Sequence, residues 1–338
     1  MIAPTFTSFV TQYLSWRMAF FLLVPVVLIQ FILLLKVSAE WKSEKKPIDN
    51  VGSLMFALMT ILITLGICNL HTYGLALVII SGLLIYLFIR YEKKKKNPIF
   101  KVSLLKNTRF MIGNYAGSAT YFVTSISTVV VSYHLLYIMD MPVHFVGLMM
   151  LITPVTMIFI SVMAGRLTVK YDERVISGAA LFVLLAAIVI FMFISRVSFE
   201  MIILGCVLQG IGQGFFSSPN NKYVLTVVDK EDLADSSSFL AASKEFGKIV
   251  STGTYTLLFA IFFGNKMLGS KGLDPLLIHT DFIMMALTVI MCISTILAIF
   301  FNIMKYDNTP SVDVLRFFNS LKPRRFKDVD LLKKYNIK

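Results

Sequence analysis

Charged residues are scarce in this chain of 338 residues, in which Asp, Glu, Lys and Arg together make up 15%. Apolar residues make up 57%, and the mean hydropathy is +0.78. So small a polar fraction is too little to cover the surface of a soluble globule of this length. The composition therefore excludes an ordinary water-soluble domain and predicts a protein whose main solvent is lipid.

Cysteine is also rare. Cys68, Cys206 and Cys292 lie far apart within apolar runs, without the spacing of a disulfide framework or of metal ligands. We expect them to be small buried hydrophobes, and we expect no metal and no cofactor. The sequence also lacks the cluster of acids or histidines near one membrane face that an integral membrane enzyme would need. We therefore expect a protein that is not an enzyme.

What the sequence has in abundance is apolar runs long enough to cross a hydrocarbon core of about 30 Å as helices. Because backbone polar groups cannot go unpaired in lipid, the predicted fold class is all-α, a polytopic membrane helix bundle. Residues 1–13 are apolar too, but as a helix they would reach only about 20 Å, so we expect a partial helix there with the chain beginning inside it. The nine predicted full spans are residues 18–37, 51–70, 74–90, 111–138, 145–164, 176–195, 201–219, 246–264 and 281–304.

The basic residues lie between these runs, and their distribution predicts the orientation, since Lys and Arg are retained on the cytoplasmic side. If Lys338 is cytoplasmic, all but four of the 32 Lys and Arg residues share its side. We expect a multi-pass protein of the cell membrane, with a membrane domain over 1–304 and a basic cytoplasmic tail over 305–338. The four exceptions are Arg17, Arg196, Lys266 and Lys271.

The formal net charge of +13 could also indicate a nucleic-acid partner. However, the basic residues form no groove or stripe with interleaved aromatics, as a nucleic-acid surface would. Runs such as Lys93 to Lys96 are typical of anchors beside anionic lipid headgroups. We therefore expect the lipid bilayer as a partner and no nucleic acid.

Polar side chains inside the spans are the candidate substrate contacts, because a polar group that faces lipid costs free energy. In the span 111–138 they recur every three or four residues and so share one helical face, and in the span 201–219 two glutamines lie one turn apart. The alternative is that the hydroxyls bond their own helix and the glutamines bond a neighbouring helix. The candidates for a substrate cavity are Asn114, Ser118, Tyr121, Ser125, Thr128, Gln209, Gln213 and Asn220.

The glycines of the span 201–219 sit within an apolar run and lack the strand and the Lys of a phosphate loop. Small residues in a membrane helix let a neighbouring helix approach closely, and this is the role that we predict. The glycines concerned are Gly205, Gly210, Gly212 and Gly214.

Few ionisable residues fall within the spans. Lys244, Glu245 and Lys248 are placed at the cytoplasmic start of the span 246–264, where snorkelling and an ion pair account for them. The acids nearest the spans are placed at outer ends, so we expect no carboxylate near the middle of a span that could carry a proton. These acids are Asp140, Glu200 and Asp281.

Short motifs carry a family resemblance. Trp16 and Arg17, in the stretch Leu-Ser-Trp-Arg-Met-Ala-Phe-Phe, resemble the junction between the fifth and sixth helices of the fourteen-helix drug/proton antiporter family of the major facilitator superfamily. In that family the preceding helix ends with a Gly-Pro-x-x-Gly-Gly motif. Pro4 matches the proline of this motif, whereas its glycines are missing here.

Two later motifs are similar to the same family. Gly165 and Arg166, with Lys170 and Arg174, look like the cytoplasmic loop that the superfamily repeats between pairs of helices. Val169 replaces the acid of that loop, and Asp172 replaces its later glycine. Lys244 and Gly247 are similar to the start of the family's thirteenth helix, with Lys in place of the usual Arg.

The resemblance covers essentially the whole chain and implies a transmembrane secondary transporter, a multidrug efflux antiporter that exports small amphipathic molecules in exchange for protons. It also implies that the nine spans correspond to helices six to fourteen and that about four and a half helices of the family are missing. We therefore expect that this chain alone does not carry out proton-coupled export and is inactive as a fragment. The alternative is a membrane receptor or assembly partner that does not transport.

Overall fold

The computed structural model describes residues 3–37, 49–70, 72–95, 100–263 and 274–306. Within these ranges the chain is built from helices, so the all-α prediction is confirmed. The predicted basic tail lies outside the described residues from residue 307 onward. Lys266 and Lys271, expected on the outer side, also lie outside them.

Nine helical segments within the described ranges are long and apolar enough to cross a membrane, in agreement with the predicted spans. A π-helical turn over His134–Ile138 continues α5, and α6 and α7 together make up the span predicted at 145–164. The shorter α1 covers most of the apolar stretch at residues 1–13. The helices are α1 Ala3–Tyr13, α2 Trp16–Val37, α3 Asn50–Cys68, α4 Gly74–Glu92, α5 Thr108–Tyr133, α6 Val143–Met149, α7 Ile152–Leu167, α8 Glu173–Met192, α9 Phe199–Thr226, α10 Leu233–Phe263 and α11 Asp274–Tyr306.

Two helices begin well before their predicted starts. The prediction for α10 began at residue 246 because the polar stretch after Leu233 looked like a loop, but this stretch is helical. The hydroxyls of Ser237 and Ser238 donate to the carbonyl of Ala234 at 2.9 and 3.0 Å, so they are satisfied within the helix. The prediction for α11 began at residue 281, whereas the helix begins at Asp274. As a result, Lys244 and Lys248 lie within α10 and Asp281 lies within α11, not at the ends of these helices.

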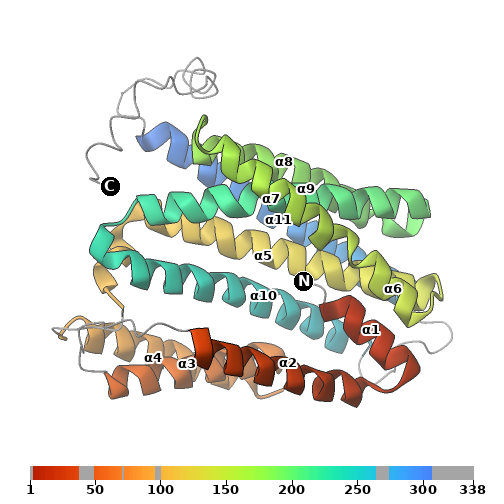
Figure 1. The fold of residues 1–338 in the computed structure, drawn as a ribbon, viewed down its shortest axis with the longest axis horizontal. Coiled ribbons are helices and arrows are strands. Elements are labelled where there is room, and N and C mark those ends of the chain that lie inside the picture. Colours follow the sequence, from red (N-terminus) through yellow and green to blue (C-terminus); the bar gives the residue numbers. More distant parts are fainter. Residues whose placement is uncertain (1–2, 38–48, 71, 96–99, 264–273, 307–338) are drawn as a thin grey trace.

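The helices form one main bundle with a smaller layer beside it (Figure 1). α8 packs on α9 and α11, α7 packs on α9, and α5 packs on α10, α11 and α9. α3 and α4 form a pair that contacts the bundle through α10, and α1 packs on α6 and α2. We call the end where α7 ends and α8 begins the basic end, and the end where α8 ends and α9 begins the far end.

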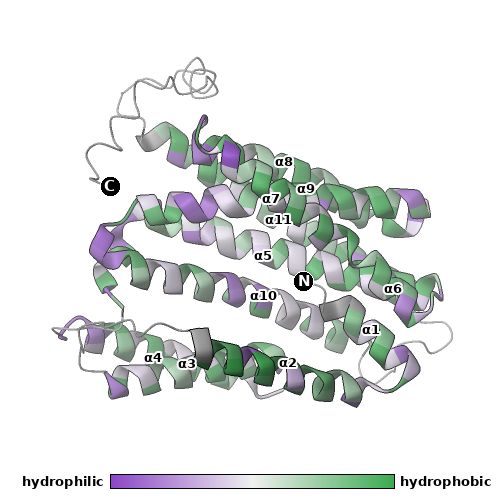
Figure 2. Cartoon of the chain, viewed as in Figure 1, coloured by the Kyte–Doolittle hydropathy of each residue, from purple (hydrophilic) through white to green (hydrophobic). Residues whose placement is uncertain are grey.

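The outer surface is apolar, as expected of a bundle surrounded by lipid. α2 is exposed along most of its length, and most of it is hydrophobic in Figure 2. In contrast, α5 and α10 carry paler and polar turns along their length in the same view. The polar side chains therefore lie mainly on helices that pack against several others, as α5 does against α9, α10 and α11.

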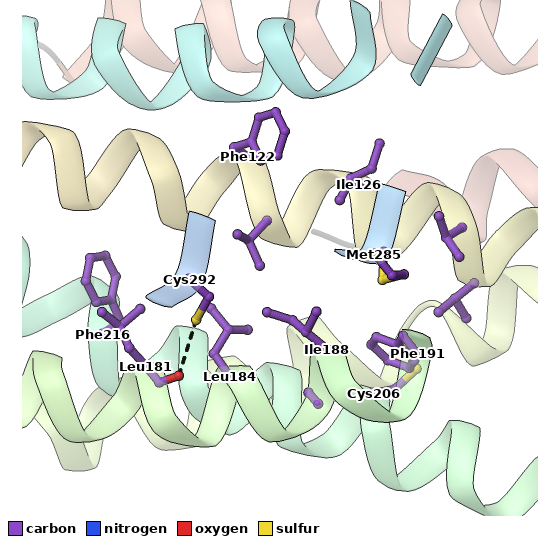
Figure 3. Close-up of a cluster of buried hydrophobic side chains, with 14 of the residues drawn as sticks. Phe122, Ile126, Leu181, Leu184, Ile188, Phe191, Cys206, Phe216, Met285 and Cys292 are labelled. Carbon is purple, nitrogen blue, oxygen red and sulfur yellow. Dashed lines mark hydrogen bonds between the residues drawn. The ribbon is translucent and has the colours of Figure 1, made fainter. Parts of the chain in front are cut away.

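A core of buried side chains joins α5, α8, α9 and α11 (Figure 3). Phe122 and Ile126 of α5, Leu184 and Ile188 of α8, and Met285 of α11 all belong to this core. Two of the three cysteines are buried hydrophobes, as predicted, whereas Cys68 is only partly buried. Cys206 and Cys292 belong to this core, and the Cys292 thiol donates to the carbonyl of Leu181 at 3.5 Å.

Glycines on two faces of α9 allow its neighbours to approach. A Cβ atom on Gly212 would lie 2.9 Å from the backbone nitrogen of Leu184 on α8, and one on Gly210 would lie 2.6 Å from the carbonyl oxygen of Thr153 on α7. Real Cβ atoms do not come so close, so these contacts require glycine. The predicted packing role of the α9 glycines is confirmed.

We predict that Gly212→Ala lowers the stability of the protein by about 1–3 kcal/mol, because α8 must shift to admit the methyl group. Gly82→Ala on α4 is the matched control, since no atom lies within 4 Å of its added Cβ. Thermal unfolding in detergent, followed by the fluorescence of a thiol-reactive dye, should show a lower apparent Tm for the first variant alone. Equal Tm values for the two variants would contradict the close packing of α8 and α9.

Candidate substrate site

A cavity of about 480 Å³ lies between α5, α7, α9 and α10. We call it the polar cavity. Five of the eight predicted substrate residues line it, namely Tyr121, Ser125, Thr128, Gln209 and Gln213. The remaining lining residues are Thr124, Val129, Val131, Met150, Thr153, Pro154, Met157, Cys206 and Lys248.

The α5 wall of the polar cavity follows from helical spacing, because Tyr121, Ser125 and Thr128 are three or four residues apart. The Thr128 hydroxyl donates to the carbonyl of Thr124 at 2.8 Å, so this residue both bonds its own helix and lines the cavity. Such a hydroxyl keeps its oxygen lone pairs and can still accept a bond from a bound molecule. The opposite face of α5, with Phe122 and Ile126, is buried in the core.

The two glutamines of α9 reach across to α5. The side-chain amide of Gln209 donates to the carbonyl of Thr124 at 3.2 Å, and that of Gln213 donates to the hydroxyl of the same residue at 3.5 Å. Both glutamines therefore form interhelical hydrogen bonds and line the cavity at the same time. An amide has two donor hydrogens and an acceptor oxygen, so each glutamine retains capacity for a ligand.

The other three candidates lie outside the lining of the polar cavity and connect helices. Asn220 of α9 donates to the carbonyl of Gly113 on α5 at 3.1 Å. Asn114 donates to Phe110 at 2.8 Å within α5 and accepts from the Ser243 hydroxyl of α10 at 3.2 Å. Contact with substrate stays a prediction for these residues, as it does for the five in the lining.

Ser118, the third of these, faces Gly247 of α10. A Cβ atom on Gly247 would collide with the backbone carbonyl of Ser118. Gly247 therefore lets α10 approach α5 at the level of the polar cavity. This contact gives a packing role to one of the residues that carry the family resemblance.

Lys244 and Lys248 lie near the middle of α10, not at the start of a span as predicted, because α10 begins at Leu233. Lys248 lines the polar cavity, and its ammonium group lies 5.2 Å from the centre of the Tyr121 ring. The ammonium group of Lys244 lies 5.4 Å from the same ring and donates to the side-chain oxygen of Asn221 at 2.5 Å. The i, i+4 spacing of the lysines was the signal in the sequence for a shared face.

The loop motif near Arg174 forms polar contacts that connect α7, α8 and α9 at the basic end. Asp172 caps α8 by accepting from the backbone N–H of Arg174 at 2.8 Å, and its other oxygen pairs with the Arg174 guanidinium at 2.8 Å. Lys222 of α9 pairs with Glu173 at 2.8 Å and donates to the carbonyl of Thr168 at 2.8 Å. The aspartate that replaces the usual glycine of this loop is thus the N-cap of α8.

The other motif residues lie away from the polar cavity lining. Gly165 and Arg166 fall in the last turn of α7, beside the capped start of α8. Trp16 begins α2, and the Arg17 guanidinium lies 4.6 Å from the centre of its ring. Pro4 lies in the first turn of α1, where a proline is tolerated.

Asp281 lies toward the far end of the bundle, as predicted, but its carboxyl is buried between helices there. It lies well inside α11, is 1% exposed, and accepts a hydrogen bond from the Tyr255 hydroxyl of α10 at 2.9 Å through Oδ1. Its Oδ2 is buried without a hydrogen-bond partner among the described residues. The side chain also borders a second cavity at the far end, about 530 Å³ in volume, together with Arg196 and His279.

We judge the polar cavity the better substrate candidate although the far-end cavity has the larger volume. The far-end cavity lies beside the α8–α9 connection, with Phe193 and Arg196 in its wall. The polar cavity is lined by the middle turns of helices and contains two amides and several hydroxyls. A substrate that crosses a membrane must pass through the middle of the bundle.

The family profile described as Major Facilitator Superfamily matches residues 113–326. The chain is 25% identical to the riboflavin transporter RibZ of Clostridioides difficile over 263 residues, covering 77% of this chain and 58% of that protein. It is 24% identical to the drug efflux pump JefA of Mycobacterium tuberculosis, covering 78% of this chain and 53% of that protein. The chain thus spans little more than half the length of these relatives.

We predict that Tyr255→Phe destabilises the protein by about 1–3 kcal/mol, because it removes the one hydrogen bond that the described residues give to the buried carboxyl of Asp281. The phenyl ring retains the packing of the tyrosine ring on Phe259. In an Asp281→Leu background the same substitution should cost close to nothing, and thermal unfolding of all four proteins measures the coupling. An equal cost in both backgrounds would show that this hydrogen bond contributes nothing.

Proposed function

This chain belongs to the major facilitator superfamily, and on that premise we propose that it forms part or all of a secondary transporter whose substrate occupies the polar cavity. The observation that carries the proposal is the cluster of amides and hydroxyls at mid-helix in an otherwise apolar bundle. Polar groups at that depth are costly unless they face a cavity or one another. A substrate site accounts for this cluster and for the space that it encloses.

The polar cavity has walls from four helices that pack differently. α7 and α9 are held close by Gly210, and α5 and α10 by Gly247. The hydrogen bonds from Gln209 and Gln213 to Thr124 link the two pairs across the cavity. In alternating access, helices rock as rigid bodies about a central site, and hydrogen bonds of this kind can break and reform during the motion. We propose that these hydrogen bonds break and reform during transport.

We further propose that transport is proton-coupled export, as in the drug/proton antiporters. The named activities of the relatives, a riboflavin transporter and a drug efflux pump, support a small amphipathic substrate. Asp281 is the carboxyl that we assign to the proton, because it is buried inside α11 with one oxygen unpartnered among the described residues. The groups that face it are Tyr255 across the hydrogen bond and Arg196 and His279 around the adjoining cavity.

The proposed location is the cell membrane, with the basic end and the C-terminal tail in the cytoplasm. The division of the basic residues supports this orientation, since Arg166, Lys170 and Arg174 gather at one end of the bundle while Arg196 lies at the other. Single-cysteine labelling of intact cells tests it. Reaction of a cysteine at Lys170 with an impermeant reagent from outside, and protection of one at Asp140, would overturn the orientation.

The transport proposal is tested in inside-out vesicles from cells that express the native gene, with neutral riboflavin, cationic ethidium and anionic 2-naphthoate as tracers. An imposed pH gradient should drive the accumulation of at least one tracer above that in vesicles without the protein. Asp281→Asn should abolish the dependence on the gradient while exchange of the tracer at equal pH persists. If none of the three tracers moves, the protein is no transporter of this class, and retained binding would favour a receptor.

We predict that the polar face of α5 is accessible to water. In a background without Cys68, Cys206 and Cys292, Ser125→Cys and Thr128→Cys should react with a charged methanethiosulfonate reagent. Phe122→Cys and Ile126→Cys are matched controls from the buried face of the same helix and should resist it. Labelling rates followed by mass spectrometry check the prediction. Equal protection at all four positions would rule out a water-filled polar cavity.

A further inference from the structure

The charge of the polar cavity specifies the substrate further. Among the described residues that line it, Lys248 is the one charged side chain, and the rest are apolar groups, hydroxyls and amides. Lys244 lies one helical turn before it, and both ammonium groups lie within 5.4 Å of the centre of the Tyr121 ring. Two cations therefore converge on one aromatic side chain of the cavity wall.

These two cations are not balanced by equal negative charge. Lys248 pairs with Glu245 at 2.7 Å, and the Glu245 side chain is 64% exposed. The hydrogen bond of Lys244 goes to the neutral amide of Asn221, and no carboxylate lies within ion-pair distance of it in the part of the chain that the structure describes. The group of Lys244, Glu245 and Lys248 thus carries a net positive charge near the middle of α10.

The Lys248 side chain is 40% exposed, so its ammonium group is open to a ligand. A surplus cation beside apolar walls attracts a negatively charged ligand group and repels a cationic one, and the low dielectric of the walls strengthens both effects. The amides of Gln209 and Gln213 can add neutral donors. The apolar part of the lining, which includes Met150 and Met157, suits a planar hydrophobic body, since methionine adapts to irregular shapes.

We propose that the polar cavity binds an organic anion, a molecule with an aromatic or apolar body and one carboxylate, sulfonate or phosphate group. The anionic group lies against Lys248 and Lys244, and the body extends between α5, α7 and α9. This inference rests on the proposed function and specifies its substrate class. It distinguishes this chain from an exporter of cationic drugs, in which a cavity carboxylate would meet the substrate.

The test uses three probes of one shape, 2-naphthoate, neutral 2-naphthamide and cationic 2-naphthylmethylamine. Binding to the purified full chain in lipid nanodiscs is measured by calorimetry, with empty nanodiscs as the blank for partition into lipid. The naphthoate should bind about tenfold more tightly than the amine, with the amide between them. Equal affinities, a preference for the amine, or no binding of the naphthoate would overturn the proposal.

Variants show whether the preference for the anion comes from Lys244 and Lys248 or from the net positive charge of the whole protein. Lys248→Gln and Lys244→Gln should each bring the affinity ratio of naphthoate to amine closer to one, and Lys248→Arg should preserve it. Lys170→Gln removes an equal charge at the basic end, outside the cavity lining, and should leave the ratio unchanged. If Lys170→Gln reduces the ratio as much as the α10 variants do, the preference belongs to the whole protein and the assigned site is wrong.

Binding and transport fail in different ways. Selective binding of naphthoate without gradient-driven movement of any tracer would support the anion site and contradict the transporter. Gradient-driven movement of ethidium, with no preference for naphthoate, would support the transporter and contradict the anion site.

Discussion

The close approach of α9 to its neighbours is the constraint on which the rest of the bundle depends. Within lipid the hydrophobic effect does not draw helices together, so backbone contact across small residues must do so. Gly210 and Gly214 face α7, and Gly205 and Gly212 face α8. Because these four residues occupy two faces of α9, the third face is left for Gln209 and Gln213, which point toward α5 and the polar cavity. The packing of α9 thus sets the position of the candidate site.

The α5–α10 side of that site also depends on a backbone contact across a glycine. Gly247 lets α10 lie against the backbone of α5, and this contact brings Lys244 and Lys248 over the ring of Tyr121. Polar groups elsewhere in the bundle are satisfied by short-range bonds, as with the hydroxyl of Thr128 and the carbonyl of Thr124. The lysines differ because their charge is only partly compensated within the described residues. That difference gives the polar cavity its electrostatic character.

Local sequence features predicted much of this architecture, but not the pairings between distant residues. The apolar runs predicted the nine spans. Helical spacing predicted that Ser125 and Thr128 share one face of α5 and that the two glutamines share one face of α9, and all four line the polar cavity. The starts of α10 and α11 were missed because a polar stretch can continue a helix beyond the lipid core. The burial of Asp281 depends on Tyr255 in the adjoining helix, and sequence spacing carries no sign of that hydrogen bond. The contact of the two lysines with the polar cavity was also not predicted, because their position near the middle of α10 depends on the helix beginning at Leu233.

The central claim is that the substrate binds between α5, α7, α9 and α10. An experimental structure in lipid nanodiscs, determined with a compound that the protein has been shown to transport, tests this claim most directly. The account predicts density for the compound inside the polar cavity, in contact with Gln209 or Gln213 and with its charged group beside Lys248. Density for the compound in the far-end cavity beside Asp281, or on the outer surface of the bundle with the polar cavity unchanged, would contradict it.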